Sequence, residues 1–225
     1  MPALTFYCQP GNAATEQAGL FLKEAGIELS VTPEDITHYL APVPTRNIPE
    51  IPAGVTLIGG NLSVPGLDLL KDPFYLAENA AITARCAIKL ISKELTGLSV
   101  LVLGWGRIGK CLGKFLESAG AKVTVAARRQ EDVAMIRALG QEGIFIHQAA
   151  EQLPRFDAVI NTVPAMVLDT SGCRQECILL ELASSPGMIG QTIIDGRGLP
   201  GKFAPAESGC LIARTILRLL EVEKP

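Results

Sequence analysis

The sequence has few histidines, few aromatic residues and no long hydrophobic run. It contains two histidines, His38 and His147, and one tryptophan among its 225 residues. Its six cysteines lack the spacing of a zinc site or a CxxC redox pair, so we expect no metal site. No apolar stretch approaches the roughly 18 residues that a membrane-spanning helix requires, so we also expect no membrane partner.

The charges of the chain nearly cancel. Twenty Lys and Arg residues stand against 23 Asp and Glu residues, which gives a net charge of −3. Such a balance offers no basic surface for nucleic acid, so no nucleic-acid partner is expected. The first residues, MPALTFYCQPGN, lack a basic segment followed by an apolar one, so we expect no signal peptide. Most cysteines lie in apolar segments, which favours reduced thiols and a cytoplasmic location.

The composition that is present is typical of a folded globular protein. Hydrophobic residues make up 48% of the chain and charged residues 19%, which excludes intrinsic disorder. Strand-like and helix-like segments alternate, which favours an α/β fold with parallel sheets. The predicted strands are residues 4–8, 27–31, 37–43, 55–58, 99–103, 122–126, 144–146, 157–161, 178–182 and 192–195. The predicted helices are residues 13–25, 72–95, 107–118, 131–139 and 206–222.

A glycine pattern gives the sharpest functional signal. Gly104, Gly106 and Gly109 form G-x-G-x-x-G between an apolar strand and a helix. The first glycine permits a tight turn, the second lets a pyrophosphate approach the backbone, and the third lets the helix pack on the strand. The amides at the start of that helix attract phosphates. The alternative interpretation is a tight turn without a ligand.

Two arginines stand where NAD-binding domains place an acidic residue. Ala126 and Ala127 end the second strand of this unit, and Arg128 and Arg129 follow. Without a carboxylate to repel it, a 2′-phosphate can be held by guanidinium groups, so NADP is favoured over NAD as the cofactor. Arg107 would add a third contact. The alternative is that Arg128 and Arg129 are solvated residues at a helix start.

A third signal follows the fourth strand of this unit. The segment FDAVINTVPAMVL places three residues at the strand's carboxyl end, where ligands of such sheets bind; an ordinary turn is the alternative. Glu181 lies in an apolar strand and needs a partner if it is buried. The predicted cofactor-binding residues are Gly104, Gly106, Arg107, Ile108, Gly109, Ala127, Arg128, Arg129, Thr162, Val163 and Pro164.

These patterns predict two domains. Residues 1–71 form a small open α/β domain, and residues 72–96 form a connector helix that begins with Asp72 as N-cap before Pro73. Residues 97–205 form a Rossmann dinucleotide-binding domain. Residues 206–225 form a C-terminal helix that packs back on the connector helix and the small domain, because its apolar stripe must be covered. Gly198, Pro200 and Gly201 predict a rigid bend before that helix.

In that order, the motifs GWGRIGK, VTVAARR, INTVPAMVL, LELASSPG and GLPGKFAP resemble the dipicolinate synthase A-subunit family of spore-forming bacteria. The resemblance extends from about Asp72 to the C-terminus, and the domain before it is shortened. It implies an NADP-dependent oxidation of a dihydrodipicolinate-type precursor to pyridine-2,6-dicarboxylate. The partners it implies are a small dicarboxylate substrate and a flavoprotein-like B subunit. Another copy of the same chain, in a homodimer, is a further candidate partner.

The resemblance carries over less well to the substrate site. The implied substrate-binding residues are Asn79, Thr83, Arg85, Ser184 and Lys202. Arg85 stands where the family carries Glu, Ser185 where it carries Arg, and Ala206 where it carries Lys. A dicarboxylate needs cationic partners, and two expected cations are missing. Arg85 either pairs with Glu207 in a compensated charge swap or itself binds a substrate carboxylate.

Three functions are therefore open at this point. The first is the NADP-dependent dehydrogenase just described, and the second is a catalytically idle NADP-binding partner or regulatory subunit. The third is a shikimate-dehydrogenase-like enzyme, which the motif INTVP resembles, but the small domain lacks the matching Lys and Asp pair. Both histidines lie in positions that do not suggest catalysis, so no catalytic acid or base is assigned.

Overall fold

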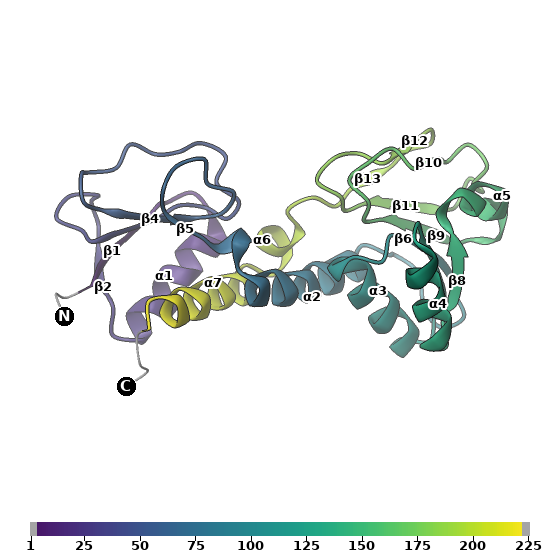
Figure 1. Cartoon of the computed structure of the whole chain (residues 1–225), viewed down its shortest axis with the longest axis horizontal. Coiled ribbons are helices and arrows are strands. Elements are labelled where there is room, and N and C mark those ends of the chain that lie inside the picture. The colour runs from purple at the N-terminus through teal and green to yellow at the C-terminus, as the bar shows by residue number, and fades with distance from the viewer. Residues whose placement is uncertain (1–3, 222–225) are drawn as a thin grey trace. The chain divides into compact units, whose positions relative to one another are not determined.

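The computed structural model describes residues 4–221, which form two compact units. The N-terminal unit comprises the residues up to Ile82 together with the segment from Pro200 onward, and the central unit comprises Thr83–Leu199. Each unit contains its own parallel sheet (Figure 1). The expected α/β class with parallel sheets is confirmed. Residues 1–3 of the predicted small domain and residues 222–225 of the predicted C-terminal helix segment lie outside the described residues.

The sheet of the N-terminal unit has five parallel strands in the order β2-β1-β3-β4-β5. The strands are β1 Thr5–Cys8, β2 Glu28–Ser30, β3 His38–Leu40, β4 Thr56–Gly59 and β5 Leu67–Asp68, and a 3-10 turn, η1 Leu69–Lys71, follows β5. Helix α1, Ala13–Glu24, begins where the Asn12 side chain accepts a hydrogen bond from the Thr15 amide at 3.0 Å. It ends before Gly26, which has a φ of +85°.

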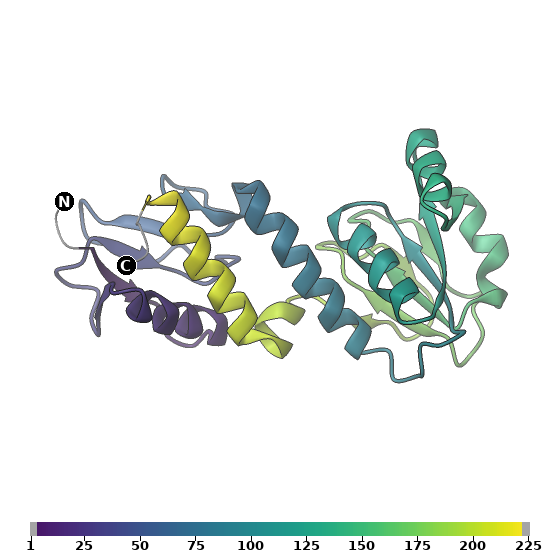
Figure 2. The ribbon, with the colours of Figure 1, turned by 90° about the horizontal axis from the view of Figure 1, so that it is seen from below.

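Helix α7, Pro205–Leu219, completes the N-terminal unit from the far end of the chain. It packs along α1, as Figure 2 shows for the yellow and purple helices. A side chain at Gly209 would place its Cβ 2.5 Å from the Cβ of Gln17, so the two helices approach closely only because this residue is glycine. Leu211, Ile212 and Ile216 of the predicted apolar stripe are buried.

Helix α2, Pro73–Lys89, crosses from one unit to the other. It is shorter than the predicted connector, which was expected to reach residues 95–96. The amides of Leu90 and Ile91 bond to the carbonyls three residues back, at 3.0 Å each, and this tighter pattern ends the helix. Gly97, the first residue after the predicted connector helix, therefore does not end α2. It lies in the following loop with a φ of +77°, and its amide donates to the Gly120 carbonyl at 2.8 Å.

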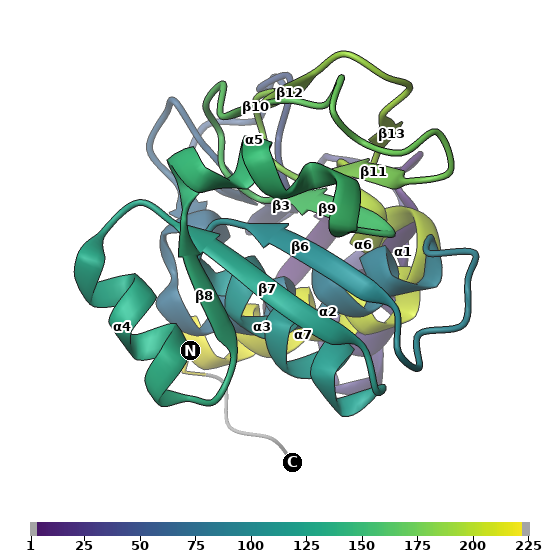
Figure 3. The same ribbon diagram turned by 90° about the vertical axis from the view of Figure 1, so that its right-hand side faces the viewer.

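The central unit contains a six-stranded parallel sheet in the order β13-β11-β9-β6-β7-β8 (Figure 3). The chain runs outward from the middle strand to β8 and then returns to the other side of β6. The point of reversal lies between β6 and β9. The strands are β6 Ser99–Leu103, β7 Lys122–Ala127, β8 Glu142–Phe145, β9 Ala158–Asn161, β11 Ile178–Glu181 and β13 Ile194–Asp195. The main helices are α3 Arg107–Ser118 and α4 Gln130–Ala138.

Several short elements were not predicted, because they are too short to show a hydrophobic period. They include β5 and η1 of the N-terminal unit and, in the central unit, the helix α5 Ala149–Gln152, the 3-10 turns η2 Ile146–Gln148 and η3 Leu153–Arg155, and the two-stranded sheet of β10 Leu168–Asp169 with β12 Met188–Ile189. Pro200 and Gly201 lie in a helical turn, α6 Leu199–Phe203, where the sequence predicted a bend. Within residues 4–221, no helix is long and apolar enough to cross a membrane.

Asp72 connects α7 to the start of α2 and gives a test of the N-terminal unit. Its buried carboxylate accepts a hydrogen bond from the Tyr75 amide at 2.7 Å and pairs with Arg218 at 2.7 Å. Burial alone would raise the pKa of Asp72, but the Tyr75 amide and the Arg218 guanidinium outweigh it, so the pKa is lowered. The charged form is therefore favoured by folding, and its contribution to stability is lost as the pH falls.

We expect Asp72→Asn to lower the free energy of unfolding by about 1–2 kcal/mol at pH 7, because a hydrogen-bonded charge is lost. The wild-type advantage should disappear as the pH falls below about 4, where the unfolded carboxyl becomes protonated. Urea unfolding at a series of pH values measures both effects. Asp35→Asn, at an exposed position, is the matched control. A constant difference between wild type and Asp72→Asn down to about pH 2 would contradict this account.

Candidate functional site

The loop between β6 and α3 presents unpaired amides at the carboxyl edge of the central sheet. Gly106 is the N-cap of α3, and its cap carries no side-chain hydrogen bond. The first amides of a helix have no partner within the helix, and they carry a partial positive charge. Gly106 and Arg107 are exposed at this helix start. The loop therefore has the donors and the electrostatic potential that bind a phosphate group.

The three glycines of the loop are required for different reasons. A Cβ on Gly109 would lie 2.1 Å from the carbonyl oxygen of Gly104, so α3 could not pack on the end of β6. Gly104 has a φ of +100°, and its Cβ would lie 2.6 Å from Oγ1 of Thr162. By contrast, a Cβ on Gly106 would meet nothing within 4 Å. The protein's own packing therefore requires Gly104 and Gly109, while the space beside Gly106 is open where the sequence predicts a pyrophosphate.

The turn after β9 lies against this loop. Thr162 donates both its amide, at 2.9 Å, and its hydroxyl, at 2.7 Å, to the carbonyl of Leu103 at the end of β6. A side chain on Gly104 would also meet Val163, at 2.8 Å. The structure thus brings together the two segments that the sequence selected, Gly104–Gly109 and Thr162–Val163. Pro164 follows and is exposed.

The two arginines after β7 differ in their surroundings. Arg129 forms a two-pronged pair with Asp132, at 2.8 and 2.9 Å, and lies 3.3 Å from Glu131. The hydrogen bond from Arg129 lowers the pKa of Asp132. Arg128 is exposed and forms no hydrogen bond or ion pair with any of residues 4–221. Its guanidinium is therefore available for an anion, whereas that of Arg129 already has two carboxylate partners.

A buried polar pair, Asn161 and Glu181, lies at the same edge, and the sequence indicated only one of its two members. Glu181 is 5% exposed, and it accepts a hydrogen bond from Nδ2 of Asn161 at 2.8 Å. The apolar strand around Glu181 indicated that this carboxylate needs a partner. Nothing in the local pattern identified Asn161, which lies 20 residues earlier. The two residues end adjacent strands, β9 and β11, and are paired in their register.

The predicted substrate-binding residues are divided between the two units. Asn79 and Lys202 belong to the N-terminal unit, and Thr83, Arg85 and Ser184 belong to the central unit. A common site for them stays a prediction, as does the pairing of Arg85 with Glu207. Burial raises the pKa of the Cys111 thiol on α3, and the positive charge of Arg85 opposes that rise.

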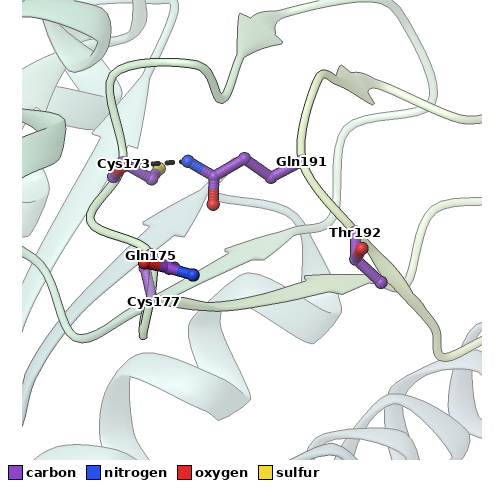
Figure 4. Close-up of a pocket in the computed structure, with 5 residues that line it drawn as sticks. All are labelled: Cys173, Gln175, Cys177, Gln191 and Thr192. Carbon is purple, nitrogen blue, oxygen red and sulfur yellow. Dashed lines mark hydrogen bonds between the residues drawn. The ribbon is translucent and has the colours of Figure 1, made fainter.

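A pocket of about 470 Å³ lies elsewhere in the central unit, before the starts of β11 and β13 (Figure 4). It is lined by Cys173, Gln175, Cys177, Gln191 and Thr192, and the Gln191 side chain donates to the Cys173 carbonyl at 2.9 Å. In a parallel sheet, this amino edge is opposite the edge that holds the glycine loop. Burial raises the pKa of Cys177 to about 12, so its thiol is protonated and a poor nucleophile.

Neither histidine shows the surroundings of a catalytic base. His38 is buried, its ring stacks on Phe6 at 4.6 Å, and burial lowers its pKa, which favours the neutral ring. His147 stacks on Phe145 at 5.5 Å. Among residues 4–221, no group of three or more His, Cys, Asp or Glu side chains could hold a metal ion. Neither histidine is therefore assigned as a catalytic acid or base. The features of the central unit that support a function are those of the glycine loop, which favour dinucleotide binding.

Comparison with known proteins supports the same interpretation of the central unit. Residues 77–172 match the family model of the NAD-binding domain of D-isomer specific 2-hydroxyacid dehydrogenases. The A subunit of dipicolinate synthase from Bacillus subtilis strain 168 is 31% identical over 149 residues, which cover 61% of this chain and 50% of that protein. The sequence match thus spans half the length of that curated relative.

Two solved structures share the fold over nearly the whole chain. The A subunit of dipicolinate synthase from Bacillus halodurans has a TM-score of 0.79 and 23% identity, with 98% of each chain covered. The corresponding dipicolinate synthase structure from Bacillus subtilis has a TM-score of 0.80 and 22% identity, with 98% of this chain and 97% of that chain covered. The predicted resemblance to the dipicolinate synthase A-subunit family, and the predicted dehydrogenase-type nucleotide-binding domain, are confirmed.

The contrast between Gly106 and Gly109 can be tested directly. We expect Gly106→Ala to change the free energy of unfolding by less than about 1 kcal/mol, since the added methyl meets no protein atom. Binding of NADP or NAD should nevertheless weaken at least about tenfold, because the methyl occupies the space of the pyrophosphate. Gly109→Ala should destabilise the protein by about 1–3 kcal/mol through its clash with the Gly104 carbonyl.

Isothermal titration calorimetry and thermal unfolding separate these two effects. Gly201→Ala serves as a control, because a Cβ there also meets nothing within 4 Å but lies outside the central unit. Unchanged dinucleotide affinity in Gly106→Ala would contradict the assignment of the loop.

Proposed function

We propose that this chain is an NADP-dependent oxidoreductase similar to the A subunit of dipicolinate synthase. It would oxidise a dihydrodipicolinate-type precursor to pyridine-2,6-dicarboxylate. The observation that carries the proposal is the glycine loop, which has open space at Gly106, the N-cap of α3, where no side chain bonds to the first amides of the helix. The resemblance to dipicolinate synthase supplies the substrate class.

The choice of NADP rests on the end of β7. Ala127, which is 2% exposed, ends the strand, and no carboxylate stands there to hold the hydroxyls of an NAD ribose. Arg128, which has no partner among residues 4–221, supplies a guanidinium for a 2′-phosphate. Asp132 and Glu131 lie nearby, and Arg129 pairs with both of them, which offsets part of their negative charge and weakens their repulsion of the phosphate. In this proposal Arg128 binds the 2′-phosphate, and Arg129 keeps the potential around it favourable.

The reaction requires little proton chemistry from the protein. The bound cofactor would accept a hydride from the ring, a proton would be released, and the product would be aromatic. Aromatisation favours the products, so the main task of the chain is to orient the two reactants. The amides of α3 would hold the pyrophosphate, and the turn at Thr162 and Val163, fixed to Leu103, would limit the position of the nicotinamide ring.

The substrate side of the proposal includes Asn79, Thr83, Arg85, Ser184 and Lys202. A dicarboxylate needs cationic partners, and Arg85 and Lys202 are the cations of this set. A flavoprotein-like B subunit is the proposed protein partner, since the similar Bacillus subtilis protein is named as one subunit of a synthase.

A catalytically idle, NADP-binding partner or regulatory subunit is the second candidate. Arg85, Ser185 and Ala206 replace the Glu, Arg and Lys that the family carries, and these changes favour it. Dihydrodipicolinate, supplied with NADP in the presence and absence of a B subunit, distinguishes the two. We expect NADPH absorbance to rise together with pyridine-2,6-dicarboxylate. NADP binding without turnover in either condition would favour the idle subunit.

The cofactor preference can be measured independently of turnover. We expect wild-type protein to bind NADP more tightly than NAD, and Arg128→Ala to lose about 1–3 kcal/mol of that preference with the charged hydrogen bonds. Arg129→Ala should lose less, since its guanidinium is already paired with Asp132. Arg137→Ala, in the last turn of α4 and bonded to the Gly143 carbonyl, is the matched control. Equal wild-type affinities for NAD and NADP would refute the assignment.

A further inference from the structure

Glu181 is a buried carboxylate without a cation bonded to it. It lies at the end of β11, is 5% exposed, and forms no ion pair with any of residues 4–221. A buried charge is costly unless hydrogen bonds replace its water. Three donors do so: Nδ2 of Asn161 at 2.8 Å and the Ala183 amide at 3.0 Å on Oε1, and the Gly187 amide at 2.8 Å on Oε2.

Asn161 extends this network to a second loop. Its Oδ1 accepts the Val163 amide at 3.0 Å, and its Nδ2 also donates to the Val163 carbonyl at 3.0 Å. One side chain therefore fixes the turn after β9, while Glu181 fixes the loop after β11. We call these two residues the Asn161–Glu181 clasp. Gly187 closes over it, since a Cβ at Gly187 would lie only 2.4 Å from Nδ2 of Asn161.

The position of the clasp determines which part of a dinucleotide it can influence. In a doubly wound sheet a dinucleotide crosses the carboxyl edge at the point where the strand order reverses. In the proposed binding mode the pyrophosphate would lie at the start of α3, and the adenosine half would lie over the end of β7, next to Arg128. The other half would then extend over β9 and β11, whose loops the clasp joins. The clasp would thus lie beneath the nicotinamide half of the cofactor.

We propose that Glu181 is a positioning residue that acts through Asn161 and Gly187 to fix the two loops around the nicotinamide ring. This inference rests on the proposed dinucleotide-binding function. Glu181 itself does not act as an acid or base, because both its oxygens are buried and engaged by donors of the protein. Its effect is conformational: without it, the turn at Val163 and the loop Ala183–Gly187 lose their common anchor.

The substitution Glu181→Gln tests this proposal with almost no change of shape. One oxygen becomes an NH2 group, which must then face either the Gly187 amide or the donors of Asn161 and Ala183. Two ligands are compared by calorimetry: NADP, and adenosine 2′,5′-bisphosphate, which lacks the nicotinamide half. We expect about tenfold weaker binding of NADP, as for a lost charged hydrogen bond, but less than about twofold change for the fragment.

Asn161→Asp provides a second variant from the other side of the same hydrogen bond. It keeps the acceptor for the Val163 amide, removes the donor to Glu181 and to the Val163 carbonyl, and sets a second carboxylate against Glu181. The same selective loss for NADP is expected, so the proposal is testable even where Glu181→Gln does not fold. Glu151→Gln, at an exposed position of the same unit, is the control and should leave both affinities unchanged.

Each outcome separates the inference from the function on which it rests. An equal loss of affinity for both ligands would show that Glu181 only stabilises the fold. Unchanged affinities would show that the clasp does not matter for binding. Either result overturns the inference. In both cases the wild-type protein still binds NADP, so the proposed function is retained. A wild-type protein that binds neither ligand would refute the proposed function, and the inference with it.

Discussion

The close packing of α3 against the end of β6 is the contact on which the candidate site depends. The helix can approach only because Gly109 has no side chain, since a Cβ there would lie 2.1 Å from the Gly104 carbonyl. This approach brings the free amides of the helix start to the carboxyl edge of the sheet. Thr162, bonded twice to the Leu103 carbonyl, attaches the neighbouring turn to the same edge. Backbone contacts thus set the geometry of the site.

Buried carboxylates play a related part in both units. Asp72 bonds to the Tyr75 amide at the start of α2, and Glu181 bonds to the Ala183 and Gly187 amides after β11. Asp157, before β9, is only partly buried; it accepts the Ser99 amide and pairs with Arg174, and these contacts help to lower its pKa. A buried acceptor left without donors is costly, so each carboxylate selects the one loop conformation that satisfies it.

Recognition of the cofactor and recognition of the substrate depend on different residues. The features proposed for the dinucleotide are main-chain amides, two tightly packed glycines and one unpaired arginine, all within the central unit. The residues proposed for the substrate are polar side chains drawn from both units, including Arg85 and Lys202. In this proposal a change of side chain at Arg85 would alter the charge offered to a substrate, because Arg85 is not part of the glycine loop.

The sequence alone determined the features that local pattern encodes. The α/β class, the bounds of α3 at Arg107–Ser118 and the glycine loop all follow from short-range periodicity and from residues that few conformations accept. The tertiary structure decided the rest. Helix α2 ends at Lys89. Arg129 pairs with Asp132, whereas Arg128 has no partner among residues 4–221. Asn161 donates a hydrogen bond to Glu181. Local patterns could indicate that Glu181 needs a donor, but hydrophobic spacing carries no information on which distant side chain the packing of β9 beside β11 will supply.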